Sequence, residues 1–159
     1  MTIALLILHG LLAVGLLGAL THQLVSVLRG VQSAAAGRPV SKASFIGRYV
    51  AVGQGGFTIA VVVLYFFTFV LGGIIYPAYR IDVRIPFEEM SLIWAVGLFE
   101  IKEHWAGVGV GVLPLYAYVW RPQNTTSHNR DRVMVTVLLA LIVWVDFIAG
   151  HVLNNIRGL

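Results

Sequence analysis

Four long runs of apolar residues, separated by shorter polar segments, make up most of this chain. They cover residues 3–28, 49–76, 90–120 and 133–153. Each run is long enough to cross a hydrocarbon core of ~30 Å, which takes about 20 helical residues. Backbone groups in lipid must form their hydrogen bonds within the segment, so the runs predict α-helices. The pattern therefore predicts an all-α integral membrane protein, one domain over residues 1–159, in which four transmembrane helices run up and down as a bundle.

Three local signals predict where these helices begin and end. Pro77 predicts the end of the second helix, because proline lacks the N–H that a helix interior needs. Pro86, followed by Glu88 and Glu89, predicts the first turn of the third helix, where acidic groups face the positive end of the helix dipole. Asn129 is typical of an N-cap and predicts the start of the fourth helix.

Basic residues are unevenly divided between the two ends of the predicted bundle. The linkers after the first and third runs carry most of them, whereas fewer lie at the opposite end. Cytoplasmic loops of membrane proteins are enriched in Lys and Arg. We therefore predict that both termini lie on the non-cytoplasmic side, and the compact loops favour a bacterial inner membrane. The first group is Arg29, Arg38, Lys42, Arg48, Arg121, Arg130 and Arg132, and the second is Arg80, Arg84 and Arg157.

Composition supports a lipid environment and removes several kinds of chemistry. Charged residues make up 11% of the chain and hydrophobic residues 58%, whereas a soluble domain carries about 25% charged residues. The chain has no cysteine, which excludes disulfides, thiolate metal sites, iron–sulfur clusters and thiol nucleophiles. The net charge of +4 is scattered over the linkers. It does not form a patch that would bind nucleic acid.

The third run is interrupted by the charged cluster EIKEH, which contains Glu100, Lys102, Glu103 and His104. Ionisable groups are costly in hydrocarbon, so they persist where they face a packed interior, pair with each other or bind something. Successive residues of a helix are turned by about 100°, which places Glu100, Glu103 and His104 in one sector and Lys102 nearly opposite. The cluster therefore marks the candidate site.

Further polar residues are expected at a similar depth. His9 on the first helix and His151 and Asp146 on the fourth fall in the non-cytoplasmic half, with Asp146 somewhat deeper. The first helix of an up-and-down bundle neighbours the second and fourth, so side chains from several helices can converge. Another group of polar residues is expected to close the same side, namely Tyr76, Tyr79, Arg80 and Arg84.

Three kinds of chemistry use such groups. A carboxylate-rich metal site would use Glu100, Glu103, His104 and Asp146, although the second Glu-x-x-His motif of di-iron bundles is missing. One haem b would be held by two imidazoles from His9, His104 and His151. A proton relay or a quinone pocket would use the same acids and imidazoles with aromatic walls. Trp94, Trp105, Tyr116 and Trp144 would supply these walls.

The predicted function is that of a small membrane protein, or a subunit of a larger complex, which binds haem b or a metal ion for electron or proton transfer. Two alternatives stay open. In one, the charged cluster pairs with Arg80 and Arg84 and the chain is a non-catalytic structural or assembly subunit. In the other, the chain is a proton-coupled transporter. The expected surroundings are the lipid bilayer, with other membrane subunits or further copies of the chain as partners.

Overall fold

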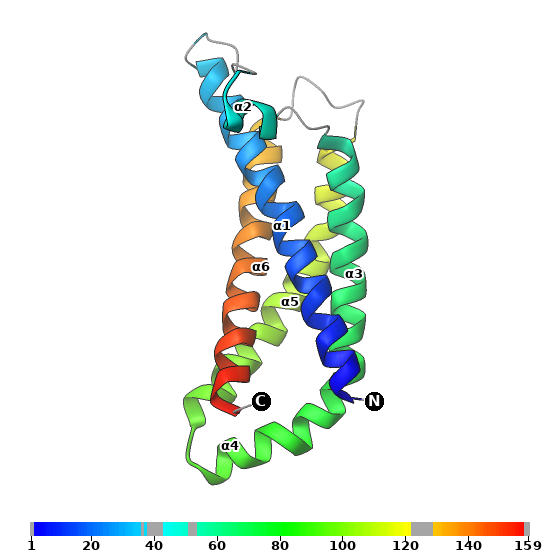
Figure 1. Cartoon of the computed structure of the whole chain (residues 1–159), viewed down its shortest axis with the longest axis vertical. Helices are drawn as coiled ribbons and strands as arrows, with labels where there is room; N and C mark the ends of the chain where they lie inside the picture. Colours follow the sequence, from blue (N-terminus) through cyan, green and yellow to red (C-terminus); the bar gives the residue numbers. More distant parts are fainter. Residues whose placement is uncertain (1, 36, 38–42, 51–53, 122–128, 158–159) are drawn as a thin grey trace.

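The computed structural model describes residues 2–35, 37, 43–50, 54–121 and 129–157. All secondary structure within these residues is helical (Figure 1), which confirms the predicted all-α class. Four helices are long, and three short ones lie at the ends of the molecule. The long helices are α1 (Thr2–Ala35), α3 (Gln54–Tyr79), α5 (Ile93–Val119) and α6 (Asn129–Arg157), and the short ones are α2 (Phe45–Val50), the π-helix η1 (Arg80–Arg84) and α4 (Ile85–Glu89).

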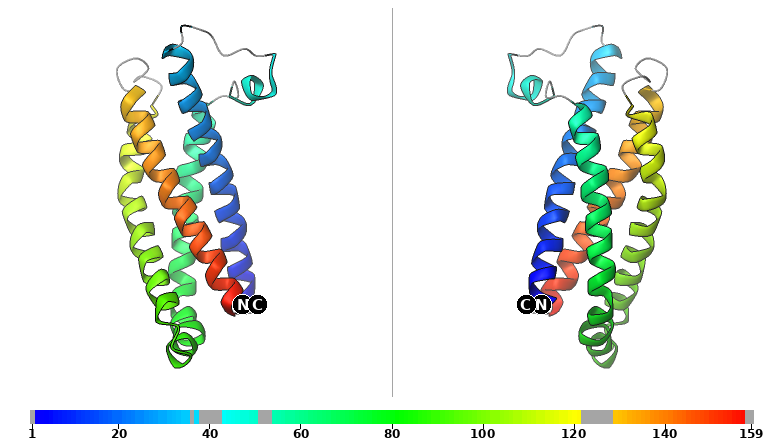
Figure 2. Two further views of the ribbon diagram at one scale, coloured as in Figure 1. Left: turned by 90° about the vertical axis from the view of Figure 1, so that its left-hand side faces the viewer. Right: turned by 90° about the vertical axis from the view of Figure 1, so that its right-hand side faces the viewer.

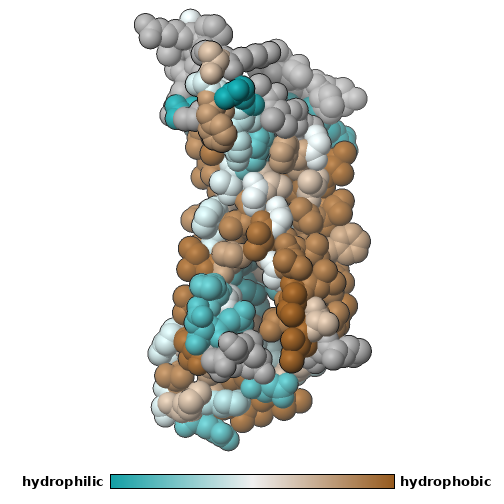
Figure 3. Space-filling view, viewed as in Figure 1, coloured by the Kyte–Doolittle hydropathy of each residue, from teal (hydrophilic) through white to brown (hydrophobic). Residues whose placement is uncertain are grey.

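Three segments of the described chain are long and apolar enough to cross a membrane, Ile3–Gly30, Gly56–Glu89 and Arg130–Ile156. Apolar residues cover the middle of the face shown in Figure 3, and polar residues gather towards its ends. The fourth long helix, α5, is not among the three, because the cluster around Lys102 lowers its hydropathy. The protein is thus a helical membrane protein by length and composition, and the crossing of α5 stays a prediction.

The four long helices lie side by side (Figures 1 and 2), and α1 lies between α3 and α6. The remaining principal contact joins α5 to α6, whereas α3 and α5 contact each other less. The first turns of α1 and the last turns of α6 lie at the same end of the molecule. The main core contains residues of all four long helices and includes Leu20, Val61, Tyr116 and Leu139.

A buried polar network crosses the upper half of this core, as viewed in Figure 1. The amide of Gln23 donates to Thr58 Oγ1 at 2.9 Å, and the hydroxyl of Tyr116 donates to Gln23 Oε1. These contacts join α1, α3 and α5. Close by, the ring of His22 stacks on Phe57 with 4.1 Å between centroids. Its Nε2 lies 2.8 Å from the carbonyl oxygen of Tyr49. These polar residues have packing partners within the protein and lie away from the candidate site.

The region around Pro77 and Pro86 differs from the prediction. The second helix does not end at Pro77, because α3 continues through it to Tyr79 and passes into the π-helix η1. Pro86 starts the short helix α4 rather than the third long helix. The helical path is interrupted between α4 and α5 at Ser91, whose φ is 58°. The N–H groups of Leu92 and Ser91 reach back to α4 carbonyls at 2.8 Å and 3.0 Å, in a Schellman arrangement.

A smaller core closes the end of the molecule that carries η1 and α4. Val83 and Phe87 point back from these short helices onto Ala95 and Val96 of α5 and Leu153 of α6. Phe87 is 1% exposed. This packing holds the segment from Arg80 to Glu89 against α5 and α6, below the space described next.

Candidate functional site

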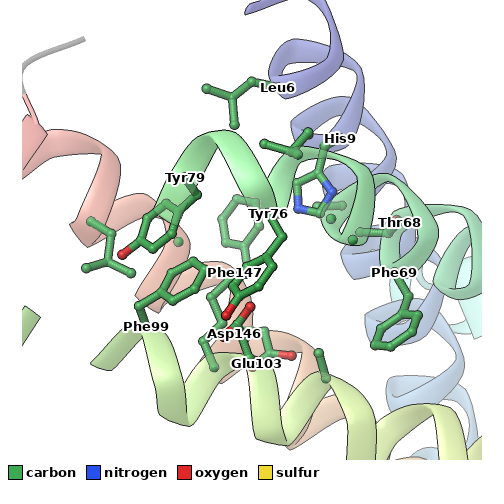
Figure 4. Close-up of a pocket in the computed structure, with 18 of the residues that line it drawn as sticks. Leu6, His9, Thr68, Phe69, Tyr76, Tyr79, Phe99, Glu103, Asp146 and Phe147 are labelled. Carbon is green, nitrogen blue, oxygen red and sulfur yellow. The ribbon is translucent and has the colours of Figure 1, made fainter. Parts of the chain in front are cut away.

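A cavity of about 380 Å³ lies between the four long helices, in the half of the molecule that contains the start of α1 and the end of α6. Figure 4 shows His9, Tyr76, Glu103 and Asp146 around this space. They belong to α1, α3, α5 and α6 respectively. Each long helix thus contributes at least one polar side chain to one cavity. This is the half of the bundle in which the sequence predicts the site.

Several polar atoms at the cavity are buried and have no hydrogen-bond partner within the protein. They are His9 Nδ1, Thr68 Oγ1, Tyr79 Oη and Asp146 Oδ1. A buried polar group without a partner costs free energy, of the order of 1–3 kcal/mol for each group. The four residues come from three helices and line the same space. The cavity is therefore surrounded by polar residues whose hydrogen bonds the protein does not satisfy.

Lys102 reaches the cavity from α5 by crossing towards α6. Its Cε would lie 3.4 Å from a Cβ added at Gly150. A side chain at position 150 would thus crowd the lysine. Gly150 follows Asp146 by one helical turn, so the two positions lie on the same face of α6. Lys102 and Asp146 interact electrostatically, yet they form no ion pair in the part of the chain that the structure describes. The ammonium and the carboxylate are therefore not in direct contact.

Aromatic rings form another wall of the cavity. Phe99 of α5 stacks on Tyr79 with 3.5 Å between ring centroids. Tyr76 lies nearly parallel to Phe99, at 6.2 Å and 8°. The ammonium of Lys102 is 5.8 Å from the centroid of Phe99, within the range of a cation–π contact. This wall places stacked aromatic rings beside a charged group.

A second glycine makes room for a polar side chain of the site. A Cβ at Gly72 on α3 would lie 3.3 Å from Cε1 of His9 on α1, so the glycine allows the imidazole to lie close to α3. At the deep edge of the cavity the hydroxyl of Tyr65 donates to the carbonyl oxygen of Ala106 at 3.0 Å. Close approach of α1 to α3 and the hydrogen bond from α3 to α5 thus both lie at the cavity.

The structure brings together half of the side chains that the sequence singles out. His9, Tyr76, Lys102, Glu103 and Asp146 line the cavity. Lys102, expected on the far side of α5, lies in the cavity with Glu103. The others lie on the outer surface of the helices or at its rim: Glu100, His104, His151, Arg80 and Arg84.

The residues at the rim have structural partners. Arg84 Nη1 is 3.2 Å from Glu100 Oε1, and Arg84 Nε is 2.7 Å from Glu88 Oε1. Arg80 donates to the hydroxyl of Tyr76 at 2.9 Å. His104 Nδ1 is 2.6 Å from the carbonyl oxygen of Glu100, one turn earlier on the same helix. These contacts order the outer end of α5.

The predicted ligand sets do not come together. Among the residues that the structure describes, no three His, Cys, Asp or Glu side chains could hold a metal ion. Of the three histidines predicted to hold haem, His9 lines the cavity and the exposed His104 and His151 do not. Of the four predicted metal ligands, Glu103 and Asp146 line the cavity, whereas Glu100 and His104 are exposed outside it.

The sequence pattern did not single out several residues of the cavity, among them Thr68, Phe99 and Gly150. Thr68 is the polar residue in the run FFTFV, and a lone hydroxyl in an apolar stretch was a usable signal. Phe99 and Gly150 carried no such signal, because their roles depend on Tyr79 and Lys102 of other helices. No family model, curated protein or solved structure matches this chain. The case for a function therefore rests on the cavity.

Proposed function

We propose that all four long helices cross the membrane and that both termini lie on its non-cytoplasmic side. Two of the charged residues of α5, Lys102 and Glu103, line the cavity, and Glu100 is paired with Arg84. The cluster is therefore compatible with a span, since its charges are paired or face the interior. The linkers that follow α1 and α5 carry basic residues where they join the helices. These junctions lie at the same end of the molecule, opposite the cavity (Figure 1). Helical spans of this kind fit an inner bacterial membrane.

Within this bundle, we propose that the cavity binds a small molecule. The observation that carries the proposal is that four residues with a buried, unbonded polar atom line one space, namely His9, Thr68, Tyr79 and Asp146. Pockets for small molecules measure about 300–1,000 Å³ and combine apolar walls with a few polar groups. A cavity of about 380 Å³ with an aromatic wall falls within this range. Lys102 and Asp146 supply the charged contacts.

The cavity supports this function better than the haem or metal centre that the sequence suggests. A haem held by two imidazoles needs histidines on facing helices, and His9 is the one predicted haem histidine that lines the cavity. The ion pairs of Arg84 favour a structural role for the rim. They do not account for the unbonded atoms inside.

The test is to fill the cavity without touching its polar groups. Ala13 lines the cavity from α1, and Ala4 of the same helix is exposed. Wild-type protein, Ala13→Phe and Ala4→Phe are purified in lipid nanodiscs and analysed for bound small molecules by native mass spectrometry. We expect a bound molecule other than lipid in the wild type and in Ala4→Phe, and its loss in Ala13→Phe. A wild-type protein without such a molecule, or equal binding in all three, would contradict the proposal.

A further inference from the structure

The charges at the cavity indicate what kind of molecule it holds. One ammonium, that of Lys102, and two carboxylates, those of Glu103 and Asp146, line it. Glu103 also interacts with Arg80 and His104 near the rim. Asp146 interacts electrostatically with the ammonium of Lys102 and with the hydroxyl of Tyr65, and of these two groups only Lys102 carries a positive charge. The pairing of the negative charge of Asp146 therefore depends on what lies in the cavity.

The pairing of Asp146 with Lys102 is incomplete. The two groups form no ion pair in the described structure, and Asp146 Oδ1 is buried without a hydrogen bond. The side chain of Lys102 extends past Gly150, one turn from Asp146. A buried charge that lacks a close partner is expensive. Pairing with a second cation would therefore stabilise the carboxylate of Asp146.

The aromatic wall favours a cation too. Phe99 lies between Tyr79 and Tyr76, with their rings nearly parallel. Aromatic faces attract cations, and aromatic surroundings are a common way to bind quaternary ammonium groups. The wall already lies within reach of the ammonium of Lys102, at 5.8 Å from Phe99. Its apolar area would also hold the hydrocarbon part of a ligand.

We propose that the ligand of this cavity is an organic cation with an apolar body, which pairs with Asp146 and rests on the wall formed by Tyr76, Phe99 and Tyr79. Lys102 is then an internal competitor: its ammonium partly compensates Asp146 when the cavity holds no cation. This inference rests on the proposed function, because it names the ligand class of the same cavity. An anion paired with Lys102 is less favourable, since Asp146 and Glu103 face the same space and would repel it.

The test compares three probes that share a benzene ring and differ in charge. Benzyltrimethylammonium is a cation, neopentylbenzene is its neutral counterpart of the same shape, and benzoate is an anion. Binding of each is measured by calorimetric titration of the protein in phosphatidylcholine nanodiscs, with empty nanodiscs as the blank. We expect the cation to bind at least 10-fold more tightly than the other two probes, and Ala13→Phe to abolish its binding.

Two substitutions are expected to change the affinity for the cation in opposite directions. Lys102→Met removes the competitor and is expected to tighten binding of benzyltrimethylammonium at least 10-fold. Asp146→Asn is expected to weaken it by at least as much, and Lys102→Arg to leave it near the wild-type value. Size-exclusion profiles and circular dichroism establish that each variant is folded. If Asp146→Asn does not fold, the direction in which Lys102→Met changes the affinity for benzyltrimethylammonium tests the inference by itself.

The inference is overturned if benzoate or neopentylbenzene binds best, or if Lys102→Met weakens cation binding or leaves it unchanged. In those cases a probe whose binding is lost in Ala13→Phe still supports a ligand cavity of another class. If no probe binds and Ala13→Phe behaves as wild type in every assay, the proposed function fails as well.

Discussion

Gly109 on α5 lets the ring of Tyr65 on α3 lie against the helix beside the cavity, and Gly109→Ala should disturb this contact strongly. A Cβ at this position would lie 2.6 Å from Cζ and 3.2 Å from Cε2 of Tyr65. The ring cannot easily move, because Tyr65 is 4% exposed and its hydroxyl donates to the carbonyl oxygen of Ala106. Overpacking costs about 1–3 kcal/mol, and the hydrogen bond is worth about 0.5–1.5 kcal/mol. We expect Gly109→Ala to lower the free energy of unfolding by about 2–4 kcal/mol on these grounds.

The matched control is Gly111→Ala on the same helix, where a Cβ would meet nothing within 4 Å. Both variants gain the same helix propensity, so their difference isolates the clash with Tyr65. Unfolding is followed by circular dichroism in mixed micelles of dodecylmaltoside with increasing dodecyl sulfate. Adding Tyr65→Leu to Gly109→Ala should recover part of the loss. Equal stability of the two alanine variants would refute the close contact between α3 and α5.

Three further predictions concern other parts of the molecule. Tyr116→Phe leaves buried Gln23 Oε1 without the hydroxyl that donates to it, so unfolding should be easier by about 1–3 kcal/mol; additive effects of Tyr116→Phe and Gln23→Leu in the double variant would contradict the contact. Arg84→Ala removes exposed ion pairs to Glu88 and Glu100 and should cost less than about 1 kcal/mol; a larger loss in the same unfolding assay would show that the rim holds the fold. His104→Ala should leave the mass-spectrometric binding signal unchanged, because His104 faces outward, and loss of the signal would bring this histidine back into the site.

The fold class could be predicted because it follows from local properties of the sequence. An apolar run of sufficient length in lipid must be helical, whatever it packs against. The segment after Tyr76 could not be predicted in the same way. Pro77 removes one backbone hydrogen bond of α3 but does not end the helical path, which continues through the π-helix η1; local π adjustments can satisfy the backbone groups that a proline frees. The break falls instead at Ser91, whose left-handed conformation is one that glycine or asparagine usually adopts.

The sequence predicts the level of the candidate site along the bundle, but it does not predict which side chains face the cavity. The positions of His9, Lys102 and Asp146 along their helices placed them in the same half of the bundle. The rotation of α5 about its axis was not available from the sequence, because the charged cluster contains ionisable residues on opposite sides of the helix. Packing of α5 against α6 turns Lys102 inward over Gly150 and leaves His104 outside. Such a choice depends on contacts between helices that no single segment encodes.

The cavity between the four long helices, with its few polar groups, is tested most directly by cysteine accessibility. The chain has no cysteine, so single substitutions report without background. Ala106 lines the cavity, whereas Val108 on the same helix is 57% exposed on the outside. Thiols react as thiolates, which form in water and not in hydrocarbon. In membrane vesicles treated with aminoethyl methanethiosulfonate, Ala106→Cys should react at least 10-fold faster than Val108→Cys, and equal rates, or the reverse order, would contradict the cavity.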